Sequence, residues 1–369
     1  MDEGIASQEL PKPRAAGPQS GSEPADCRLQ EAMLEKVSRT FALTIPVLPD
    51  PLRRIVGNAY LLCRIVDTVE DEPALSPARK ERFTGEFVRA VGGECAPEDF
   101  SVELAPLLSA FTTPAAKELI GQTPYVLGVT GSFPPEQRRA LERCVRVMAE
   151  GMVGFQQRKD SGRRGLSDEA AMDRYCYHVA GVVGEMLTEL FCLHVPEELG
   201  AEREEMTALG RSFGQGLQMT NILKDIWDDL ERDACWLPRS VFDRVDFDLD
   251  DLRQGQDSPE FERGLGILLG IAHGHLANGL EYTLRIPARE VGIRTFCLWS
   301  VGMAILTLRK INRRRGYTSG SQVKIKRSSV KATAALIRAS VGHDAVLRAA
   351  FRAAGRGLPH TDVSAHGPF

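Results

Sequence analysis

After the first 26 residues, apolar residues recur at helical spacing along almost the whole chain. No stretch alternates apolar and polar residues as a half-buried strand does. The pattern predicts an all-α protein, and prolines mark where the helices stop. The predicted helices cover residues 28–45, 51–71, 77–92, 100–110, 115–127, 135–158, 168–194, 201–231, 258–284, 288–312 and 328–352.

The chain is predicted to form one domain, because no change of composition divides its body. Residues 1–26 are rich in Pro, Gly, Ser and acid and lack an apolar core segment, so we expect a disordered leader and not a signal peptide. Residues 27–354 would form the helical domain, and residues 355–369 a disordered tail.

Composition narrows the function classes. The 369 residues are 43% hydrophobic, which suffices for a sizeable core. A formal net charge of -4 offers no basic excess, so we expect no nucleic-acid partner. The eight cysteines are scattered without the spacing of a zinc site, which predicts reduced thiols in a cytoplasmic protein. The longest uncharged run near the C-terminus, residues 295–308, is shorter than the roughly 20 residues of a membrane span.

A polar stripe follows the predicted helix 201–231. Asn221, Asp225 and Asp229 follow one another at steps of four, and Gln218 lies one turn earlier. The other side of this helix is apolar enough to be buried. A single stripe of this kind is usually a solvated face, because buried carboxylates are costly unless a cation meets them. A second acidic stripe elsewhere in the chain favours the interpretation that these carboxylates bind a cation.

That second stripe lies on the predicted helix 51–71, where Tyr60, Arg64, Asp67 and Asp71 share a face. Arg64 and Asp67 alone would be an intrahelical ion pair worth about 0.3 kcal/mol. Two carboxylate pairs suit Mg²⁺, which takes one or two carboxylates and completes its shell with water and phosphate oxygens. The two helices would thus bind a diphosphate, and Mg²⁺ would make it a better leaving group.

Three cations close to these motifs, Arg39, Arg64 and Lys224, would add positive charge at the leaving oxygens. Arg39 taken alone is better interpreted as an ordinary surface arginine. An allylic diphosphate ionised in this way gives a carbocation, which needs an apolar and aromatic pocket without water. The motifs therefore predict ionisation of an allylic diphosphate.

Four segments together resemble the squalene and phytoene synthases, the head-to-head branch of the class I isoprenoid synthases, over most of residues 35–330. SRTFAL resembles the entry segment of the family, and YLLCRIVDTVED its first aspartate motif. DRYCYHVAGVVGEMLTELF resembles its tyrosine-bearing central helix, and LQMTNILKDIWDD its second aspartate motif. All four occur in the order of the family. The resemblance implies the class I isoprenoid synthase fold, a single helical domain around a central cavity.

The resemblance also implies a role for each matching residue. The ligands of Mg²⁺ and the diphosphates would be Asp67, Asp71, Asn221, Asp225 and Asp229. The other substrate contacts would be Ser38, Arg39, Phe41, Tyr60, Arg64, Gln218 and Lys224. Tyr175 matches the tyrosine associated with proton handling. A phenol with a pKa near 10 is a poor base, so the released diphosphate is an alternative proton acceptor, and a structural role for Tyr175 stays open.

The C-terminal third favours a member of the family that reduces its intermediate. Residues 295–308 resemble the helix that lines the second-step pocket of squalene synthases, and residues 323–326 resemble a basic segment assigned to NADPH. The implied cofactor contacts are Asn221, Lys224, Phe296, Cys297, Lys324 and Lys326. A buried apolar helix and a solvated basic patch are the alternative interpretations.

The chain departs from the family at two places. Residues 299–301 are Trp-Ser-Val where squalene synthases often have Ile-Pro-Gln, which leaves the cofactor pocket open. Asp233 and Ala234 stand where the family commonly has Gly-Arg, so that one phosphate contact is lost or supplied elsewhere. No Gly-x-Gly-x-x-Gly unit is present, and NADPH would bind without a Rossmann domain.

Two further patterns allow two interpretations each. Five glycines lie inside predicted helices, where each costs up to about 1 kcal/mol relative to alanine, and they mark close helix packing or room for a ligand. They are Gly181, Gly184, Gly210, Gly214 and Gly216. The polar loop 156–167 is interpreted as a solvated connection in preference to a mobile flap over substrate.

The resemblance implies a prenyltransferase that condenses two farnesyl diphosphates head to head to presqualene diphosphate and reduces it with NADPH to squalene. Two alternatives stay open: a synthase that makes presqualene diphosphate, dehydrosqualene or phytoene without reductant, and a non-catalytic helical assembly factor, which the four aspartates disfavour. We expect a cytoplasmic monomer, and leave open a peripheral contact with a membrane for product release.

Overall fold

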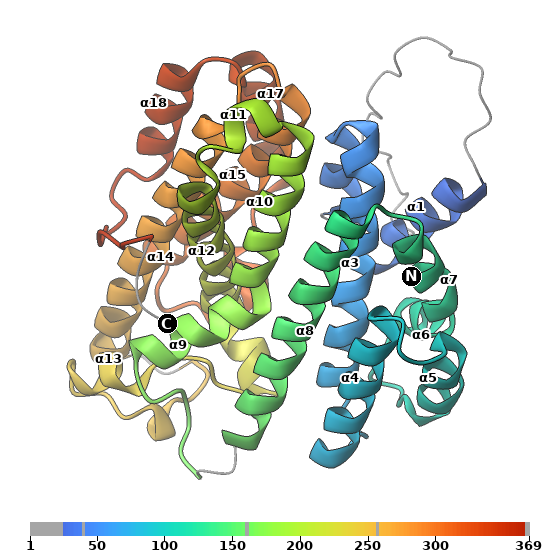
Figure 1. Cartoon of the computed structure of the whole chain (residues 1–369). Coiled ribbons are helices and arrows are strands. Elements are labelled where there is room, and N and C mark those ends of the chain that lie inside the picture. Colours follow the sequence, from blue (N-terminus) through green and yellow to red (C-terminus); the bar gives the residue numbers. More distant parts are fainter. Residues whose placement is uncertain (1–24, 39–40, 159–161, 256–257, 366–369) are drawn as a thin grey trace, which may run out of the picture.

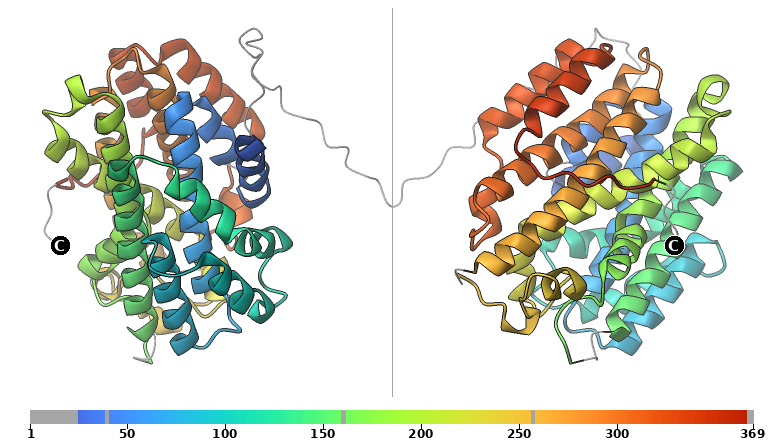
Figure 2. Two further views of the ribbon diagram at one scale, coloured as in Figure 1. Left: turned by 45° about the vertical axis from the view of Figure 1, so that its right-hand side comes forward. Right: turned by 90° about the vertical axis from the view of Figure 1, so that its left-hand side faces the viewer.

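The computed structural model of the protein describes residues 25–38, 41–158, 162–255 and 258–365. Over these residues the protein is all-α, which confirms the predicted fold class. Extended backbone pairs there only at an isolated parallel bridge between Leu166 and Pro238. Figures 1 and 2 show the long helices side by side in a bundle, with shorter helices around them.

The N-terminal half contains two of the long helices, α3 and α8, and the short helices beside them. Several of these helices begin with proline, and Ser76 and Thr113 cap two of them by accepting a hydrogen bond from a backbone N–H of the first turn. The helices are α1 (Ala25–Val37), α2 (Phe41–Thr44), η1 (Ile45–Val47), α3 (Asp50–Asp71), α4 (Pro77–Val91), α5 (Pro97–Leu104), η2 (Ala105–Leu107), α6 (Pro114–Gly121), α7 (Thr123–Gly131) and α8 (Pro135–Arg158).

The C-terminal half contains the other long helices. A π-helical turn, η4 (Tyr177–Gly181), joins α9 (Glu169–Cys176) to α10 (Val182–His194). The remaining elements are α11 (Pro196–Leu199), α12 (Arg203–Leu230), α13 (Arg239–Asp243), η5 (Leu249–Asp251), α14 (Pro259–Arg285), α15 (Val291–Arg313), α16 (Gly320–Val323), α17 (Arg327–Ser340) and α18 (Asp344–Ala354).

The structure divides three of the predicted helices. The first predicted helix ends at Val37, the predicted helix 115–127 is split at Gln122, and the last is split between Ser340 and Asp344. These breaks are only one to three residues long, so the periodicity of the apolar residues does not show them. Helix α1 begins at Ala25, inside the predicted leader, and residues 1–24 lie outside the described part of the chain.

The tail prediction was wrong for residues 355–365, which lie against α14. The backbone N–H of Thr361 donates to the carbonyl oxygen of Gly270 at 3.1 Å. The side-chain amide of Asn278 donates to the carbonyl oxygen of Val363 at 3.1 Å. The polar composition of the tail did not show that its backbone groups find partners on a neighbouring helix. Residues 366–369 of the predicted tail lie outside the described residues.

Helix α12 packs against α9, α10, α14, α15 and α16. Its contact with α10 brings the two backbones together, because a Cβ atom at Gly184 would lie 1.9 Å from the carbonyl oxygen of Gly210. A Cβ atom at Gly214 would lie 2.1 Å from the carbonyl oxygen of Ala180. Close helix packing is therefore the role of these glycines.

Two segments are long and apolar enough to cross a membrane by length and composition alone, residues 169–194 and α15. In the structure, 56% of the most apolar window of each is buried inside the bundle. Core helices of globular proteins meet the same criterion, since they bury apolar residues on several sides.

Glu72, the first residue after α3, is a fully buried carboxylate. It accepts hydrogen bonds from the backbone N–H of Ala74 and of Ser109, both at 2.9 Å, and from the hydroxyl of Thr112 at 2.6 Å. Although burial opposes ionisation, these donors lower the pKa of Glu72 from 4.5 to about 2. The carboxylate thus fastens the end of α3 to residues 109–112.

We predict that Glu72→Gln lowers the free energy of unfolding at pH 7 by on the order of 3 kcal/mol. Because the folded-state pKa is depressed, the contribution of Glu72 is complete above about pH 4.5 and disappears as the pH falls to about 2. Denaturant unfolding at pH 7, 5 and 3 measures this. The exposed Glu81→Gln is the control, and an equal effect of both variants at pH 7 would contradict the assignment.

Candidate active site

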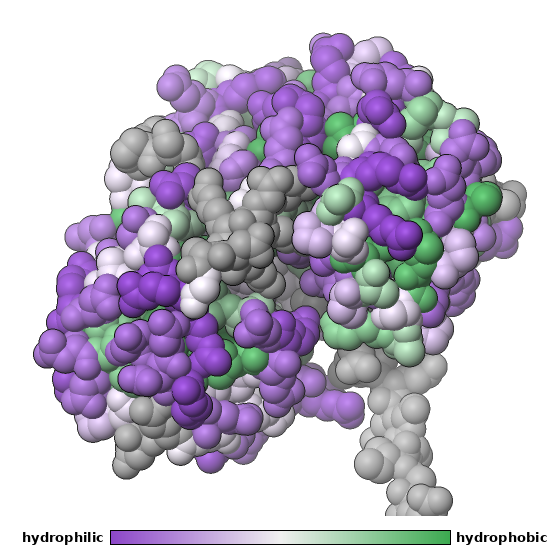
Figure 3. Space-filling view, turned by 90° about the horizontal axis from the view of Figure 1, so that it is seen from below, coloured by the Kyte–Doolittle hydropathy of each residue, from purple (hydrophilic) through white to green (hydrophobic). Residues whose placement is uncertain are grey.

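A cavity of about 930 Å³ lies where α3 and α12 end. Figure 3 shows the molecule from that side, with hydrophilic residues gathered around a hollow. Both acidic motifs reach this cavity, as their spacing predicts. The lining residues are Arg64, Glu70, Asp71, Pro73, Leu75, Pro77, Lys80, Phe111, Tyr175, Gln218, Asn221, Ile222, Lys224, Asp225, Asp229, Arg232, Ala234 and Trp236.

The first motif places its two carboxylates differently. Asp71 is exposed and lines the cavity, whereas Asp67 is half-buried one turn behind it and is not among the described lining residues. Burial and the neighbouring charge of Asp71 raise the pKa of Asp67 to about 7, and Arg64 opposes this rise. A cation near these carboxylates would relieve both the burial cost and the repulsion.

The second motif does not form a regular helical stripe. Asp225 has non-helical backbone angles (φ -105°, ψ 15°) inside α12, which kinks there. Its carboxylate lies 3.0 Å from the ammonium nitrogen of Lys224. Burial raises the pKa of Asp225, and raises the pKa of Asp229 to about 6. The kink was not predictable from spacing, because the apolar pattern continues through it.

The cavity contains an unsatisfied cationic donor. The Nε atom of Arg64 is buried and has no hydrogen-bond partner among the described residues. The nearest carboxylate contact of this side chain is 3.9 Å, between Arg64 Nη1 and Asp67 Oδ2. A buried donor without a partner is costly, so the geometry favours an anion at this place.

Two cations of the lining, Lys80 and Arg232, were not predicted from the sequence. The guanidinium of Arg232 lies 2.6 Å from Asp229 Oδ1. Arg232 is two residues before Ala234, where the family commonly has arginine, and Asp233 has a φ of 54°, in the left-handed region that favours glycine. Arg232 thus supplies a guanidinium to the cavity close to the position where the sequence lacks the family's arginine.

Tyr175 lies between two aromatic rings. The indole of Trp236 stacks on it, with ring centroids 4.0 Å apart and planes 9° apart, and Phe155 meets it edge-on at 5.2 Å. Burial, followed by the charges of nearby carboxylates, raises the pKa of Tyr175 well above 10. The phenol therefore stays protonated at neutral pH. Trp236 follows the predicted helix, and no spacing rule identified it.

The predicted entry-segment residues cluster one or more turns away from the cavity lining. The hydroxyl of Ser38 accepts a hydrogen bond from the backbone N–H of Phe41 at 2.9 Å. The ring of Phe41 lies 5.2 Å from that of Tyr60, whose hydroxyl donates to the carbonyl oxygen of Val37 at 3.4 Å. Arg39 lies outside the described residues.

The predicted cofactor residues fall into two groups. Phe296 and Cys297 are buried in the core, where burial raises the pKa of the Cys297 thiol to about 12. They do not appear in the described lining of this cavity, and their role as cofactor contacts stays a prediction. Lys324 and Lys326 are exposed beyond α16. A Cβ atom at Gly320, the first residue of α16, would lie 3.0 Å from Asp225 Oδ1, so this segment borders the second motif.

The described part of loop 156–167, which is predicted to be a solvated connection, is partly exposed and is also anchored by hydrogen bonds. The backbone N–H of Arg164 donates to Asp250 Oδ1 at 2.8 Å, and its guanidinium donates to the carbonyl oxygen of Leu252 at 2.9 Å. Leu166 pairs with the backbone of Leu237 and Arg239. This segment lines another cavity, of about 750 Å³, which shares Trp236 with the first one.

The donor set fits Mg²⁺ held together with a substrate. Over the described residues, no three His, Cys, Asp or Glu side chains gather closely enough to hold a metal alone. Carboxylates from two helices instead line one cavity, beside the unsatisfied Arg64. Mg²⁺ commonly takes one or two carboxylates and completes its shell with water and phosphate oxygens, which this arrangement allows.

Comparison with known proteins decides the family. The squalene/phytoene synthase family profile matches residues 34–329. The chain belongs to the squalene/phytoene synthase family. Squalene synthase from Eremothecium gossypii is 28% identical over 276 residues, which are 75% of this chain and 60% of that protein. Squalene synthase 10 from Panax ginseng is 30% identical over 287 residues, 75% of this chain and 62% of that protein.

Solved structures confirm the isoprenoid synthase fold. The complex of TcSQS with the ligand BPH1237 has a TM-score of 0.72 at 21% identity, and the match covers 92% of this chain and 94% of that one. A dehydrosqualene synthase in complex with a ligand has a TM-score of 0.61 at 17% identity, covering 85% and 95%. The chain spans about three fifths of the length of the squalene synthases named above.

We predict that Mg²⁺ with inorganic pyrophosphate raises the melting temperature by about 2 °C or more at pH 8. The carboxylates bind metal when ionised, and the raised pKa values of Asp67 and Asp229, about 7 and 6, make protons compete below pH 7. The shift should therefore shrink from pH 8 to pH 5. Thermal unfolding measures it.

The variant Asp225→Asn should lose this shift. The exposed Asp228→Asn on the same helix should keep it and is the control. A shift of equal size at pH 5 and pH 8 in the wild type would contradict binding by these carboxylates.

Proposed function

We propose that the protein is a squalene synthase, a prenyltransferase that joins two farnesyl diphosphates head to head through presqualene diphosphate and reduces this intermediate with NADPH. One observation carries the proposal: carboxylates from α3 and α12 meet the buried, unsatisfied Arg64 in one cavity. Family membership and the relatives named squalene synthase support the choice of reaction.

Asp71, Asp225 and Asp229 would hold Mg²⁺ from the two sides of the cavity, with Asn221 and Asp67 beside them. Bound Mg²⁺ would neutralise the diphosphate and favour its departure. Arg64, Lys224 and Arg232 would bind its oxygens directly, since charge-assisted hydrogen bonds to phosphate are strong. Gln218 would add a neutral donor to the same wall. The entry-segment residues Ser38, Arg39, Phe41 and Tyr60 stay proposed substrate contacts.

The aromatic wall would protect the cation left after diphosphate departure. Trp236 and Tyr175 present stacked rings to the cavity, and ring faces stabilise cations while excluding water. Because Tyr175 stays protonated, its hydroxyl would donate a hydrogen bond and would not remove a proton. The released diphosphate is the better proton acceptor.

The reductive step depends on a site for NADPH. We propose that Lys324 and Lys326 bind its phosphates, because their segment borders Asp225 and stands exposed to solvent. Asn221 and Lys224 would face the cofactor from α12. Phe296 and Cys297 would shape the hydrocarbon pocket from inside the core.

A synthase without the reductive step is the second candidate. The burial of Phe296 and Cys297 outside the described cavity lining favours it, and so does Trp299, which packs toward Leu298 and Ile337. Its product would be presqualene diphosphate, dehydrosqualene or phytoene. For either candidate we propose a cytoplasmic monomer that contacts a membrane surface peripherally, because a hydrocarbon product needs an apolar acceptor.

We predict that Asp71→Asn lowers Mg²⁺-dependent diphosphate release from farnesyl diphosphate by at least about 100-fold, because a carboxylate that faces the leaving group is lost. Release of diphosphate from the purified protein measures this. The control is Asp50→Asn, which changes an exposed carboxylate in the first turn of the same helix. This variant should release diphosphate at the wild-type rate. Wild-type turnover by Asp71→Asn would refute the metal assignment.

We predict that NADPH changes the product formed from farnesyl diphosphate from a diphosphate to squalene. Lys324→Ala should then impair reduction more than condensation, whereas Lys331→Ala, also exposed, should affect neither. Product analysis with and without NADPH tests this. An unchanged product on addition of NADPH would select the non-reductive candidate, and equal loss of both steps in Lys324→Ala would assign Lys324 to the diphosphate.

A further inference from the structure

Helix α9 separates two cavities. Tyr175 and Trp236 border the cavity of the candidate active site, whereas Asp173, two residues before Tyr175, borders a different cavity of about 330 Å³. The wall of this rear cavity comes from α9, α12, α14 and the chain after α18. Its polar residues include Arg211, Gln215 and His275.

The outer wall of the rear cavity is residues 359–365, which we call the C-terminal strap. The strap lies in a groove of α14 that depends on glycine, since a Cβ atom at Gly274 would lie 2.0 Å from the carbonyl oxygen of Thr361 and 2.5 Å from Val363 Cγ2. Thr361 donates its backbone N–H to Gly270 at 3.1 Å. His273 Nδ1 lies 2.9 Å from the carbonyl oxygen of Pro359.

A chain of polar groups leads from the strap toward α9, with Ser212 and His275 buried and Asn278 and Asp173 half-buried. Asn278 donates to the carbonyl oxygen of Val363 at 3.1 Å and to the hydroxyl oxygen of Ser212 at 2.9 Å. Ser212 Oγ lies 2.9 Å from His275 Nδ1. The Ser212 hydroxyl thus links Asn278 to the ring of His275.

The chain ends at the helix that carries Tyr175. His275 Nε2 lies 3.9 Å from Asp173 Oδ1, a contact longer than a hydrogen bond. Burial lowers the pKa of His275 to about 4, which keeps it neutral at pH 7. Gln215 clamps the same residue, donating to Asp173 Oδ1 at 2.7 Å and to its carbonyl oxygen at 3.3 Å.

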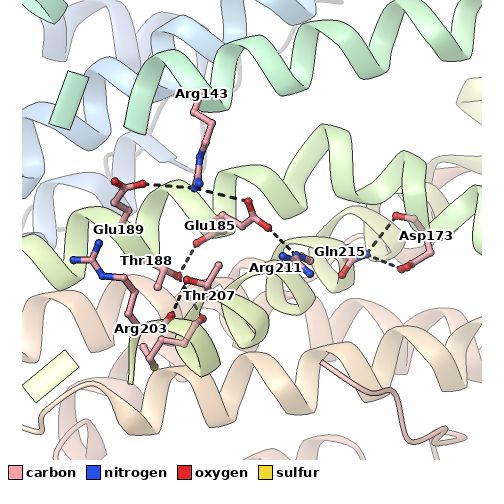
Figure 4. A network of polar contacts seen from close by, with 11 residues as sticks. Arg143, Asp173, Glu185, Thr188, Glu189, Arg203, Thr207, Arg211 and Gln215 are labelled. Carbon is pink, nitrogen blue, oxygen red and sulfur yellow. Dashed lines mark hydrogen bonds and ion pairs between the residues drawn. The ribbon is translucent and has the colours of Figure 1, made fainter. Parts of the chain in front are cut away.

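Figure 4 shows this clamp within a larger network between α8, α10 and α12. Arg211 donates to Glu185 at 2.7 Å, and Glu185 also lies 3.9 Å from Arg143. Within this network, Gln215 contacts α9 through Asp173. The strap and the polar contacts that include Asn278 hold the side of α9 that faces α14.

We propose that the C-terminal strap positions Tyr175 and its stacked Trp236 by bracing α9 from the rear cavity, through Asn278, Ser212, His275 and Asp173. None of these four residues lines the active-site cavity in the described structure, so they are positioning residues that act through Tyr175. The catalytic part of the inference rests on the proposed function. The mechanical coupling between strap and α9 does not.

The test uses the full chain with Gly274→Ala, which places a methyl group where the strap lies. Hydrogen–deuterium exchange should rise in residues 359–365 and also in 169–176. The control is Gly128→Ala, a helical glycine with no neighbouring atom within 4 Å of its Cβ position, which should change neither segment. Faster exchange of the strap with unchanged exchange of α9 overturns the coupling, and unchanged exchange of both segments overturns the seating of the strap.

Activity supplies the second measurement. A misplaced Tyr175 should lower kcat for diphosphate release by about tenfold or more, while KM for farnesyl diphosphate stays within about twofold, because α3 and α12 still bind the diphosphates. A rise in KM with unchanged kcat overturns a positioning role. A wild-type chain without any turnover would refute the proposed function, while the exchange measurement would still decide the coupling.

Asn278→Leu gives the same test if Gly274→Ala fails to fold. It removes the amide that joins Val363 to Ser212 without adding an atom to the groove, and Thr361 keeps its bond to Gly270. Exchange of α9 and kcat should change in the same directions. Wild-type values of both overturn the proposal.

Discussion

Charge repulsion inside a partly desolvated cavity is the constraint on which the rest of the structure depends. Burial raises the pKa of Asp67, Asp225 and Asp229. The ionised form of each carboxylate is therefore destabilised until a cation binds beside it. Holding such groups together requires rigid helices that would otherwise move apart. The close contacts of α12 with α10, and the hydrogen bonds of Glu72 at the end of α3, supply this rigidity.

The same constraint explains how acidic, basic and aromatic residues are distributed around the cavity. Acidic groups face basic groups that are only partly satisfied by protein partners, and Arg64 keeps a donor without one over the described residues. The described lining contains four basic and four acidic side chains, so the site carries groups for both a metal ion and a diphosphate. The aromatic wall of Tyr175 and Trp236 is neutral, and it contributes ring faces where a carbon-centred charge would form.

Much of the fold and half of the site could be predicted from the sequence. Asp71, Asn221, Asp225 and Asp229 share the cavity because helical spacing fixes which residues face one way. Spacing could not show the kink at Asp225, nor that Asp67 lies behind Asp71. Arg232 and Trp236 reach the cavity through a turn with a left-handed Asp233, and no periodic pattern describes such a turn. The strap was missed because its bonds are made by backbone, which composition does not reveal.

The π-helical turn at Tyr177–Gly181 limits where this chain can gain or lose a residue. The turn contains one residue more than an α-helical path would need, and it separates the helix of Tyr175 from the glycine contacts of α10. Removing one residue there would restore a continuous α-helix and rotate α9 by about 100° relative to α10. Tyr175 would leave the cavity although every side chain of the site was retained. Insertions and deletions in this turn are therefore more damaging than most substitutions near it.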